Sequence, residues 1–431
     1  MIAHIYRSSK DYRLHKKILF SKKEASYPTI NVNQSVKRQQ IKGFGGAFTE
    51  SSAHVYYTLN RMNQLLVMKI LFSRRGLHYN LGRTTVGSCD FSIAPYDYAR
   101  EDDLSDFTLV HDRMEIIPFI KEANKVTNLT LLASCWSPLA KYKSNQDKCH
   151  GGTLLPEYYD MAAKYLALYV ENMKKEGLTI YALTVQNEPE ATQTWESCLF
   201  TPEEEYQYAT IVKKYLPECD IYGYDHNRDH LMNWANTLYS LDKDKKVFKG
   251  LAYHWYEGYQ NDQIKLVKDT YPDRDLIFSE GCLELLNLNR EDPTSAIGNY
   301  DGAIRYFKNY LLDSNNGATA FFDWNLLLDE KGGPNHVGNY CEALVMKRGK
   351  KLRVNSSFYG VYHFAHFIQK DAYNIETTSK ENILSTAFLN PDNSIVVELL
   401  NEGPEKRIDV IVKDRVFNFS LRTNELATLV V

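Results

Sequence analysis

The chain has 431 residues, a formal net charge of -3, 44% hydrophobic residues and 24% charged residues. This balance is typical of a globular protein, and it gives no sign of the basic surface that a nucleic-acid-binding protein usually has, so we expect no nucleic-acid partner. The length exceeds one ordinary hydrophobic core and fits one large barrel together with a small second domain. No stretch approaches the length of a membrane-spanning helix, so we expect no membrane span.

The first 38 residues contain strand-like pieces but are too short to form a domain. We expect residues 1–38 to pair with strands at the other end of the chain, because unpaired strand edges leave backbone groups unsatisfied. The segment Met1–Arg7 lacks the basic start and the long apolar stretch of a secretory leader. We therefore expect a cytoplasmic protein, unless a leader has been removed from the chain.

From about residue 41 to about residue 330, short strand-like runs alternate with amphipathic helical stretches, which is typical of βαβ units. The helical stretch from Glu203 to Leu216 follows Thr201 and Pro202, a combination that favours a helix start. Eight strands are predicted, and eight such units close into a barrel more often than they form an open sheet. The predicted strands are Ile41–Ala47, Leu77–Thr84, Leu129–Ser134, Ile180–Gln186, Asp220–Tyr224, Gly250–Trp255, Asp275–Ser279 and Ala318–Trp324.

The C-terminal part of the chain has strand-like alternation without helices, interrupted by turn residues. The predicted strands there are Ile383–Leu389, Ser394–Leu400, Ile408–Val412, Val416–Leu421 and Glu425–Val431. We therefore predict an α/β fold with two domains. A (β/α)8 TIM barrel is expected over residues 39–354, and an additional antiparallel β-sandwich is expected from residues 1–38 together with residues 355–431.

Two glutamates follow predicted strands of the barrel. Glu188 lies in Asn187-Glu188-Pro189 after the fourth strand, and Glu280 follows the seventh. The carboxyl ends of barrel strands build the active site, and glycoside hydrolysis needs two carboxylates that flank the scissile bond. Either glutamate alone is as well explained by a solvated loop residue. Together they predict a pair of catalytic carboxylates. In this pair, we expect partial burial and the negative charge of Glu280 to raise the pKa of Glu188.

Other sequence patterns argue against a cofactor. The glycines of Gly43–Ala47 lack the dinucleotide-binding spacing, and no Walker motif, HExxH motif or nucleophile elbow occurs. The histidines are scattered along the sequence and do not cluster at metal-ligand spacing. We therefore expect no cofactor and no metal site, and the sequence predicts no particular oligomeric state.

Seven motifs in unbroken order resemble glycoside hydrolase family 30, with the strongest likeness to the glucosylceramidases of clan A. The resemblance runs from about residue 40 to the C-terminus. The motifs are Gly43–Glu50, Gly87–Ser92, Leu132–Pro138, Thr184–Pro189, Tyr253–Tyr256, Phe278–Gly281 and Asp323–Asn339.

The resemblance implies a role for each matching residue. It implies Glu188 as the general acid/base and Glu280 as the nucleophile, with Asn187 bound to the sugar 2-OH and Tyr256 holding Glu280. His254 matches a position behind the residues that contact the sugar. Asp90, Trp136, Trp324 and Asn339 match positions that line the glycone pocket, and Trp195 falls near the entrance on the aglycone side.

The chain departs from the family pattern on the leaving-group side. Lys141 stands near the place of a second aromatic residue, and His336 and Gly338 replace a tryptophan and an arginine of the human-type motif. Lipid or an extended aglycone would be handled there, so this side does not resemble a ceramide-binding site.

The resemblance implies an exo-acting, retaining β-glycoside hydrolase, expected to act on β-glucosides through a covalent glycosyl-enzyme intermediate. The expected partner is a β-linked glycoside or oligosaccharide. β-Xylosidase, β-fucosidase and β-1,6-glucanase activities of the same family are alternatives. A catalytically silent carbohydrate-binding barrel is a further alternative, and the presence of both carboxylates with Asn187 and Tyr256 argues against it.

Overall fold

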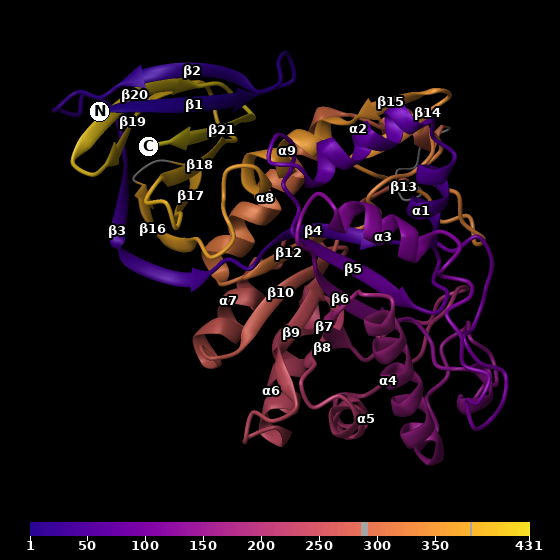
Figure 1. The fold of residues 1–431 in the computed structure, drawn as a ribbon. Coiled ribbons are helices and arrows are strands. Elements are labelled where there is room, and N and C mark those ends of the chain that lie inside the picture. The colour runs from indigo at the N-terminus through magenta and orange to yellow at the C-terminus, as the bar shows by residue number, and fades with distance from the viewer. Residues whose placement is uncertain (286–291, 380–381) are drawn as a thin grey trace.

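The main body of the molecule is a closed barrel of eight parallel strands surrounded by helices (Figure 1). The computed structural model describes residues 1–285, 292–379 and 382–431. The barrel strands are β4 (Gly43–Phe48), β5 (Leu81–Val86), β6 (Thr130–Cys135), β7 (Ile180–Thr184), β8 (Asp220–Asn227), β9 (Phe248–His254), β10 (Asp275–Glu280) and β12 (Ala320–Asp323). Each predicted strand overlaps one of them, and β12 pairs with β4 to close the ring. The predicted (β/α)8 barrel is confirmed.

The helices cover the outside of the barrel. They are α1 (Glu50–Tyr57), α2 (Arg61–Phe72), α3 (Ile116–Asn124), α4 (Tyr159–Lys175), α5 (Pro202–Tyr215), α6 (Leu231–Leu241), α7 (Asn261–Thr270), α8 (Tyr300–Asn316) and α9 (Ser356–Ala365). Helix α5 begins with a capping box, in which Thr201 accepts from the Glu204 amide and the Glu204 carboxylate accepts from the Thr201 amide. Among the described residues, no helix is long and apolar enough to cross a membrane.

Two short strand pairs lie outside the barrel wall. Strand β11 (Leu283–Glu284) pairs with β13 (Cys341–Glu342), and β14 (Val345–Arg348) pairs with β15 (Lys351–Val354). The first pair joins the segment that follows β10 to the long loop that follows β12. Both segments therefore lie at the carboxyl end of the barrel.

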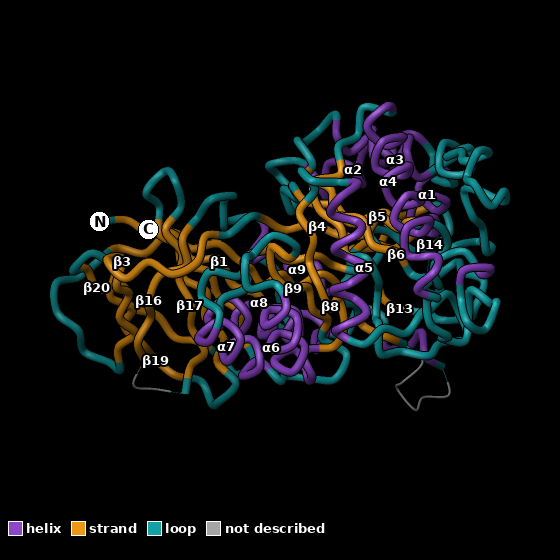
Figure 2. Tube along the Cα trace, turned by 90° about the horizontal axis from the view of Figure 1, so that it is seen from below, coloured by secondary structure: helices purple, strands orange, loops and turns teal. Residues whose placement is uncertain are grey.

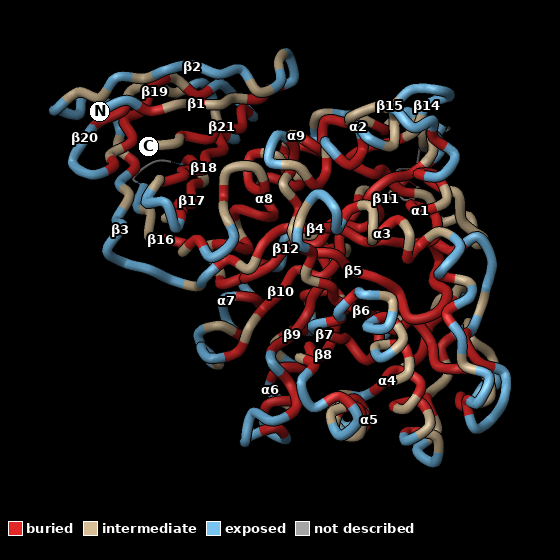
Figure 3. Tube along the Cα trace, viewed as in Figure 1, coloured by how far each residue is buried: buried red, intermediate tan, exposed pale blue. Residues whose placement is uncertain are grey.

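The barrel interior changes character along its axis. At the amino end of the strands, large apolar side chains such as Leu132, Ile277 and Phe322 fill the barrel. Towards the carboxyl end the buried side chains become polar and include Arg83, Asp225 and Ser279. The strands are buried along most of their length (Figure 3). Buried polar groups need partners, so this polar layer marks the end at which chemistry is expected.

The second domain is a nine-stranded sheet that contains both ends of the chain (Figures 1 and 2). Its strands, in spatial order, are β2 (His15–Phe20), β1 (Ile2–Ser8), β21 (Glu425–Val430), β18 (Ile395–Asn401), β17 (Ile383–Leu389), β16 (Tyr373–Ser379), β3 (Thr29–Gln40), β19 (Lys406–Val412) and β20 (Arg415–Leu421). The N-terminal strand β1 pairs with β21. Strand β3 pairs with β16 in the antiparallel sense and with β19 in the parallel sense. The parallel pair is possible because no hairpin joins these two strands.

Helix α9 connects the two domains. The expected boundary after residue 354 assigns α9 to the second domain, yet its Phe364 ring contacts Phe307 of α8 with 5.1 Å between centroids. On another side, His363 contacts Thr428 of β21 at 2.6 Å and Ser8 of β1 at 2.9 Å. The helix thus packs on both domains, and the boundary itself stays a prediction.

Candidate active site

The two predicted catalytic glutamates meet in one pocket at the carboxyl end of the barrel. Glu280 is the last residue of β10, and Glu188 lies shortly after the end of β7. Both line a cavity of about 380 Å³. Of the other predicted site residues, Asp90, Trp136, Asn187, Trp195, Tyr256, Trp324 and Asn339 also line this cavity. The lining residues that the sequence did not predict are Ala191, Gln193, His226, Asn227, Glu257, Cys282 and Glu284.

The backbone holds Glu188 in an unusual conformation. Its φ of 48° lies in the left-handed region, which costs a residue with a side chain about 1–3 kcal/mol. Two hydrogen bonds fix the segment, from the Glu188 amide to the Asp225 carbonyl at 3.0 Å and from the Asn187 amide to the Cys135 carbonyl at 2.6 Å. Neighbouring strands therefore determine where the Glu188 carboxylate points.

Glu280 is surrounded by groups that stabilise negative charge. The Arg83 guanidinium donates to one carboxylate oxygen, and the Tyr256 hydroxyl donates to the other at 2.9 Å. Arg83 also donates to Asn187 Oδ1 at 2.9 Å. Arg83 was not predicted as a site residue, although an arginine inside a predicted barrel strand is a signal of a buried charge.

Asp225 connects the surroundings of the two glutamates. Its Oδ2 accepts from Arg83 at 2.9 Å, while its Oδ1 lies 3.0 Å from His254 Nε2. Burial would raise the pKa of Asp225, but these two partners hold it well below its usual range. Burial likewise opposes the charge on Arg83, and the carboxylates of Asp225 and Glu280 outweigh it and raise the Arg83 pKa. Asp225 was also missed, because the predicted strand ended one residue earlier.

Two histidines flank Glu188 and reverse the expected direction of its pKa shift. His254 Nδ1 lies 3.1 Å from Glu188 Oε1, and His226 Nδ1 lies 3.7 Å from the same atom. Burial raises the pKa of Glu188, but the two histidines outweigh burial and hold it below its usual range. The prediction of a raised pKa was therefore wrong. Against its own burial, the nearby carboxylates raise the pKa of His254 to about 9. In the free protein the proton resides on His254, which is fully buried behind Glu188.

One wall of the pocket is aromatic. The rings of Trp136 and Trp324 stack with 5.3 Å between centroids, and the Arg83 guanidinium lies 4.8 Å from the Trp136 ring. Sugar rings present apolar C–H faces that pack on such surfaces. The wall is thus suited to a sugar whose hydroxyl groups point along it.

Next to this wall, Asp90 offers a hydrogen-bond acceptor without a protein partner. Its Oδ2 accepts from the Asn339 side chain at 2.9 Å, whereas its Oδ1 is buried and has no partner. Burial, with the charge of Glu280, raises the pKa of Asp90 to about 8. A buried polar atom without a partner is costly, and a sugar hydroxyl would satisfy it.

The three departures from the family pattern have distinct structural consequences. His336 turns away from solvent and pairs with Glu196 at 3.4 Å, which links the loop after β12 to the loop after β7. Lys141 contacts Asp102 at 2.7 Å and does not line the cavity. Gly338 has a φ of 76°, a conformation that side chains rarely adopt. Where the human-type motif has a tryptophan, this chain thus has a polar link between two loops on the leaving-group side of the pocket.

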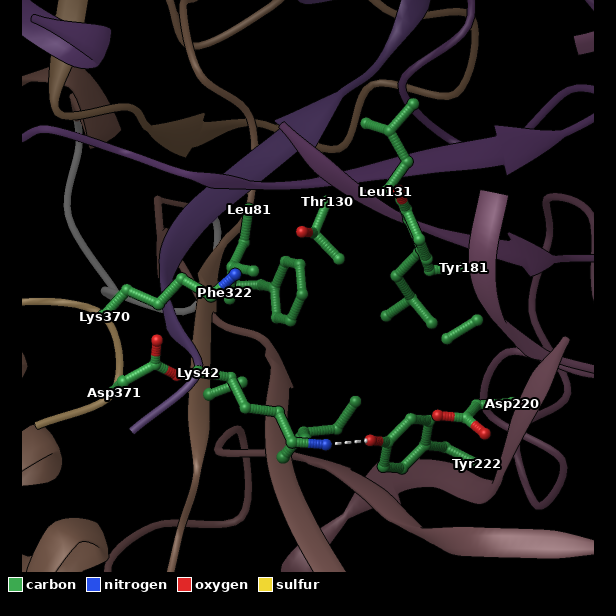
Figure 4. Close-up of a pocket in the computed structure, with 14 residues that line it drawn as sticks. Lys42, Leu81, Thr130, Leu131, Tyr181, Asp220, Tyr222, Phe322, Lys370 and Asp371 are labelled. Carbon is green, nitrogen blue, oxygen red and sulfur yellow. Dashed lines mark hydrogen bonds between the residues drawn. The ribbon is translucent and has the colours of Figure 1, made fainter. Parts of the chain in front are cut away.

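A second cavity of about 200 Å³ lies at the opposite end of the barrel (Figure 4). It is lined mainly by apolar side chains from the amino ends of the strands, such as Leu81 and Phe322. Its polar edge is a contact of Lys42 Nζ with the Tyr222 hydroxyl at 2.7 Å and with Asp275 at 2.5 Å. This end of a TIM barrel serves stability, so we place the chemistry in the first cavity.

Comparisons with known proteins agree with this architecture. The model of the glycosyl hydrolase family 30 TIM-barrel domain matches residues 41–368, and that of the family 30 β-sandwich domain matches residues 371–428. Putative glucosylceramidase 3 of Caenorhabditis elegans is 29% identical, over 91% of this chain and 79% of its own length. An endo-1,6-β-D-glucanase of Neurospora crassa is 24% identical, over 80% of this chain and 73% of its own length.

Among solved structures, the crystal structure of SrfJ from Salmonella typhimurium superposes with a TM-score of 0.94. It is 31% identical and covers 100% of this chain and 99% of that chain. The resemblance seen in the sequence motifs is thereby confirmed. Both domain models of the family match in order along the chain, and the protein belongs to glycoside hydrolase family 30.

Proposed function

We propose that this glycoside hydrolase is an exo-acting, retaining β-glycosidase that cleaves β-glucosides. The observation that carries the proposal is the contrast between the two glutamates of the pocket. Glu280 is held by a buried cation and a hydroxyl donor, whereas Glu188 contacts His254, which carries the proton in the free protein. Two carboxyl groups in different environments are what a nucleophile and an acid/base need.

In the first step, Glu280 attacks the anomeric carbon and displaces the leaving-group oxygen, which receives a proton from Glu188. In the free enzyme His254 holds this proton. The proton passes from His254 Nδ1 to Glu188 Oε1, which lie 3.1 Å apart. In the second step, Glu188 removes a proton from water, and the resulting hydroxide releases the sugar from Glu280. Direct attack requires carboxyl groups about 5–5.5 Å apart, which stays a prediction.

The aromatic wall and the unpaired Asp90 oxygen support a single terminal sugar as the glycone. The name of the C. elegans relative supports glucose in that place. The His336–Glu196 link stands where the glucosylceramidase motif has tryptophan, so we propose a small or sugar aglycone instead of ceramide.

A panel of nitrophenyl β-glycosides of glucose, xylose, fucose and galactose tests the glycone. The glucoside should have the highest kcat/KM, and NMR should show the β-anomer as the first product. An α-anomer as the first product would reject the retaining mechanism. A higher kcat/KM on another glycoside would reject glucose as the preferred glycone.

Two variants test the roles of the glutamates. Glu280→Ala should lose turnover on every substrate. Glu188→Ala should keep its glycosylation rate on dinitrophenyl glycosides, whose leaving group needs no proton, and azide should rescue its second step. Equal losses for both variants on the activated substrate would refute the assignment.

The second candidate is a β-1,6-glucanase. It is favoured by the N. crassa relative and by the departures at His336 and Gly338. Incubation with a long β-1,6-glucan separates the candidates, because an endo-acting enzyme releases mixed oligosaccharides early and an exo-acting one releases only glucose.

A further inference from the structure

Three side chains from adjacent strand ends of the barrel converge on one point beside the pocket. They are Glu188 after β7, His226 on β8 and His254 on β9. One ligand atom from each lies within 4.8 Å of the other two. The histidines are scattered in the sequence, and the barrel brings these two together in space.

The separations match the edges of a small coordination tetrahedron. Glu188 Oε1 lies 3.1 Å from His254 Nδ1 and 3.7 Å from His226 Nδ1. Zinc binds nitrogen and carboxylate oxygen at about 2.0–2.2 Å, which places two tetrahedral ligand atoms about 3.4 Å apart. These two distances lie on both sides of this value, and the ligand atoms of all three residues lie within 4.8 Å of one another, so the cluster can close around an ion.

His254 has the supporting contact that metal-binding histidines need. Its Nε2 lies 3.0 Å from Asp225 Oδ1, which orients the ring and leaves Nδ1 directed at Glu188. A carboxylate behind a ligating histidine fixes the ring and makes the nitrogen a better donor.

His226 supplies a second observation that points to a ligand. Its Nδ1 is shielded from solvent and makes no hydrogen bond, and its contact with Glu188 Oε1 is 3.7 Å long. A buried nitrogen in this state needs an explanation, and a metal ion in front of it would satisfy it. His226 and Glu188 both line the cavity, so the fourth coordination position faces water or substrate.

We propose that Glu188, His226 and His254 form a binding site for a divalent transition-metal ion of the zinc class, and that the bound ion inhibits the enzyme. Two imidazoles and one carboxylate suit Zn²⁺, whereas Mg²⁺ and Ca²⁺ require mostly oxygen ligands. Inhibition follows because the ion occupies the Glu188 oxygen that otherwise transfers the proton. This inhibitory part rests on the proposed function, whereas metal binding does not.

Isothermal titration of the intact 431-residue chain, freed of metal, with Zn²⁺ tests the site directly. We expect one saturable ion per chain and no comparable binding of Mg²⁺. Co²⁺ should give the visible absorption of a four-coordinate complex and should be displaced by Zn²⁺. An absence of saturable Zn²⁺ binding, or a six-coordinate Co²⁺ spectrum, would overturn the proposal.

Matched variants locate the ion. His226→Asn should weaken Zn²⁺ binding at least tenfold. His230→Asn is the control, because His230 is an exposed histidine beside Glu190 and lies outside the cluster; it should bind Zn²⁺ as the wild type does. Glu188→Gln is a second, nearly isosteric test by titration if His226→Asn does not fold. Unchanged binding in both Glu188→Gln and a folded His226→Asn, or lost binding in His230→Asn, would refute the site.

Inhibition is measured separately on an aryl β-glycoside. Zn²⁺ should inhibit with a constant equal to the dissociation constant from titration, and EDTA should restore the full rate. Binding without inhibition would overturn the inhibitory part. If the metal-free enzyme cleaves no glycoside at all, the proposed function fails, and titration still decides the metal site.

Discussion

Replacement of Arg83 by methionine removes the cation that holds Glu280. The Arg83 side chain is fully buried and binds Glu280, Asp225, Asn187 and Ser134. Methionine fills a similar volume without charge, so the variant leaves two buried carboxylates without their common partner. Breaking a buried ion pair in this way costs about 3–5 kcal/mol of stability.

The same variant should also lose catalytic rate, because a charge-assisted hydrogen bond to Glu280 is lost. Such a bond contributes about 1.5–3 kcal/mol, which corresponds to a fall in kcat of about 10- to 150-fold. The kcat of Arg83→Lys should lie between those of Arg83→Met and the wild type. Lysine keeps the positive charge, but its ammonium group cannot form the fork that reaches both carboxylates.

A matched control separates stability from catalysis. Arg228 is equally buried and pairs with Asp313 at 2.8 Å, but neither residue lines the active-site cavity. Urea denaturation should show similar losses for Arg83→Met and Arg228→Met, whereas the rate on an aryl glycoside should fall only for Arg83→Met. Equal rates in the two variants under folding conditions would show that Arg83 acts only in stability.

Three further predictions concern pH and domain packing. The pKa of His254 is raised to about 9, so the proton for the acid step is lost only near that pH. For a substrate with a poor leaving group, His254→Gln should move the alkaline limb of the kcat/KM profile to lower pH. An unmoved limb would contradict this. Burial lowers the pKa of His363 from 6.5 to about 3. Between these two pH values the unfolded chain therefore binds a proton that the folded chain does not, so the free energy of unfolding should fall by about 1.4 kcal/mol for each unit by which the pH is lowered from 6.5 towards 3. Urea denaturation of His363→Gln at several pH values should show that this pH dependence of the free energy of unfolding is smaller by about 1.4 kcal/mol per pH unit, which is the contribution of one proton. An unchanged pH dependence would disprove the assignment. Deletion of residues 1–38 removes β1, β2 and nearly all of β3, which exposes the edges of β21, β16 and β19. The product should aggregate in size-exclusion chromatography, and a monodisperse, active product would contradict this.

The sequence could predict the barrel and its two glutamates because both depend on local patterns. Strand-like runs show where each strand ends, and Glu188 and Glu280 follow directly. The sequence could not predict Asp225 as a site residue, because positive φ values at Tyr224 and Asp225 and a register shift extend β8 beyond its predicted end. The pairing of β3 with β19 depends on contacts between distant segments, which no local pattern encodes.

The direction of the Glu188 pKa shift was missed for the same physical reason. The expectation was based on burial and on Glu280, whereas the shift is controlled by His226 and His254, which neighbouring strands bring into contact. Local sequence identifies which groups can titrate, but the sign of a shift depends on which charges the fold places within a few ångströms.

Asp225 is the residue through which the two halves of the site act on each other. One carboxylate oxygen binds the arginine that holds Glu280, and the other binds the histidine that contacts Glu188. Asp225→Asn keeps the shape but removes the charge that both partners need, so both chemical steps should slow by about 10- to 100-fold. Glu188→Gln, in contrast, should spare the first step on dinitrophenyl glycosides.

Pre-steady-state measurement of the dinitrophenol burst separates the two steps. For Asp225→Asn the burst rate and the steady-state rate should both fall, and Asp313→Asn, which removes a buried charge outside the cavity, should leave both unchanged. A burst rate at the wild-type level in Asp225→Asn would show that Arg83 and Tyr256 hold Glu280 without help. Asp225 would then act only on Glu188, through His254, and the two glutamates would work independently.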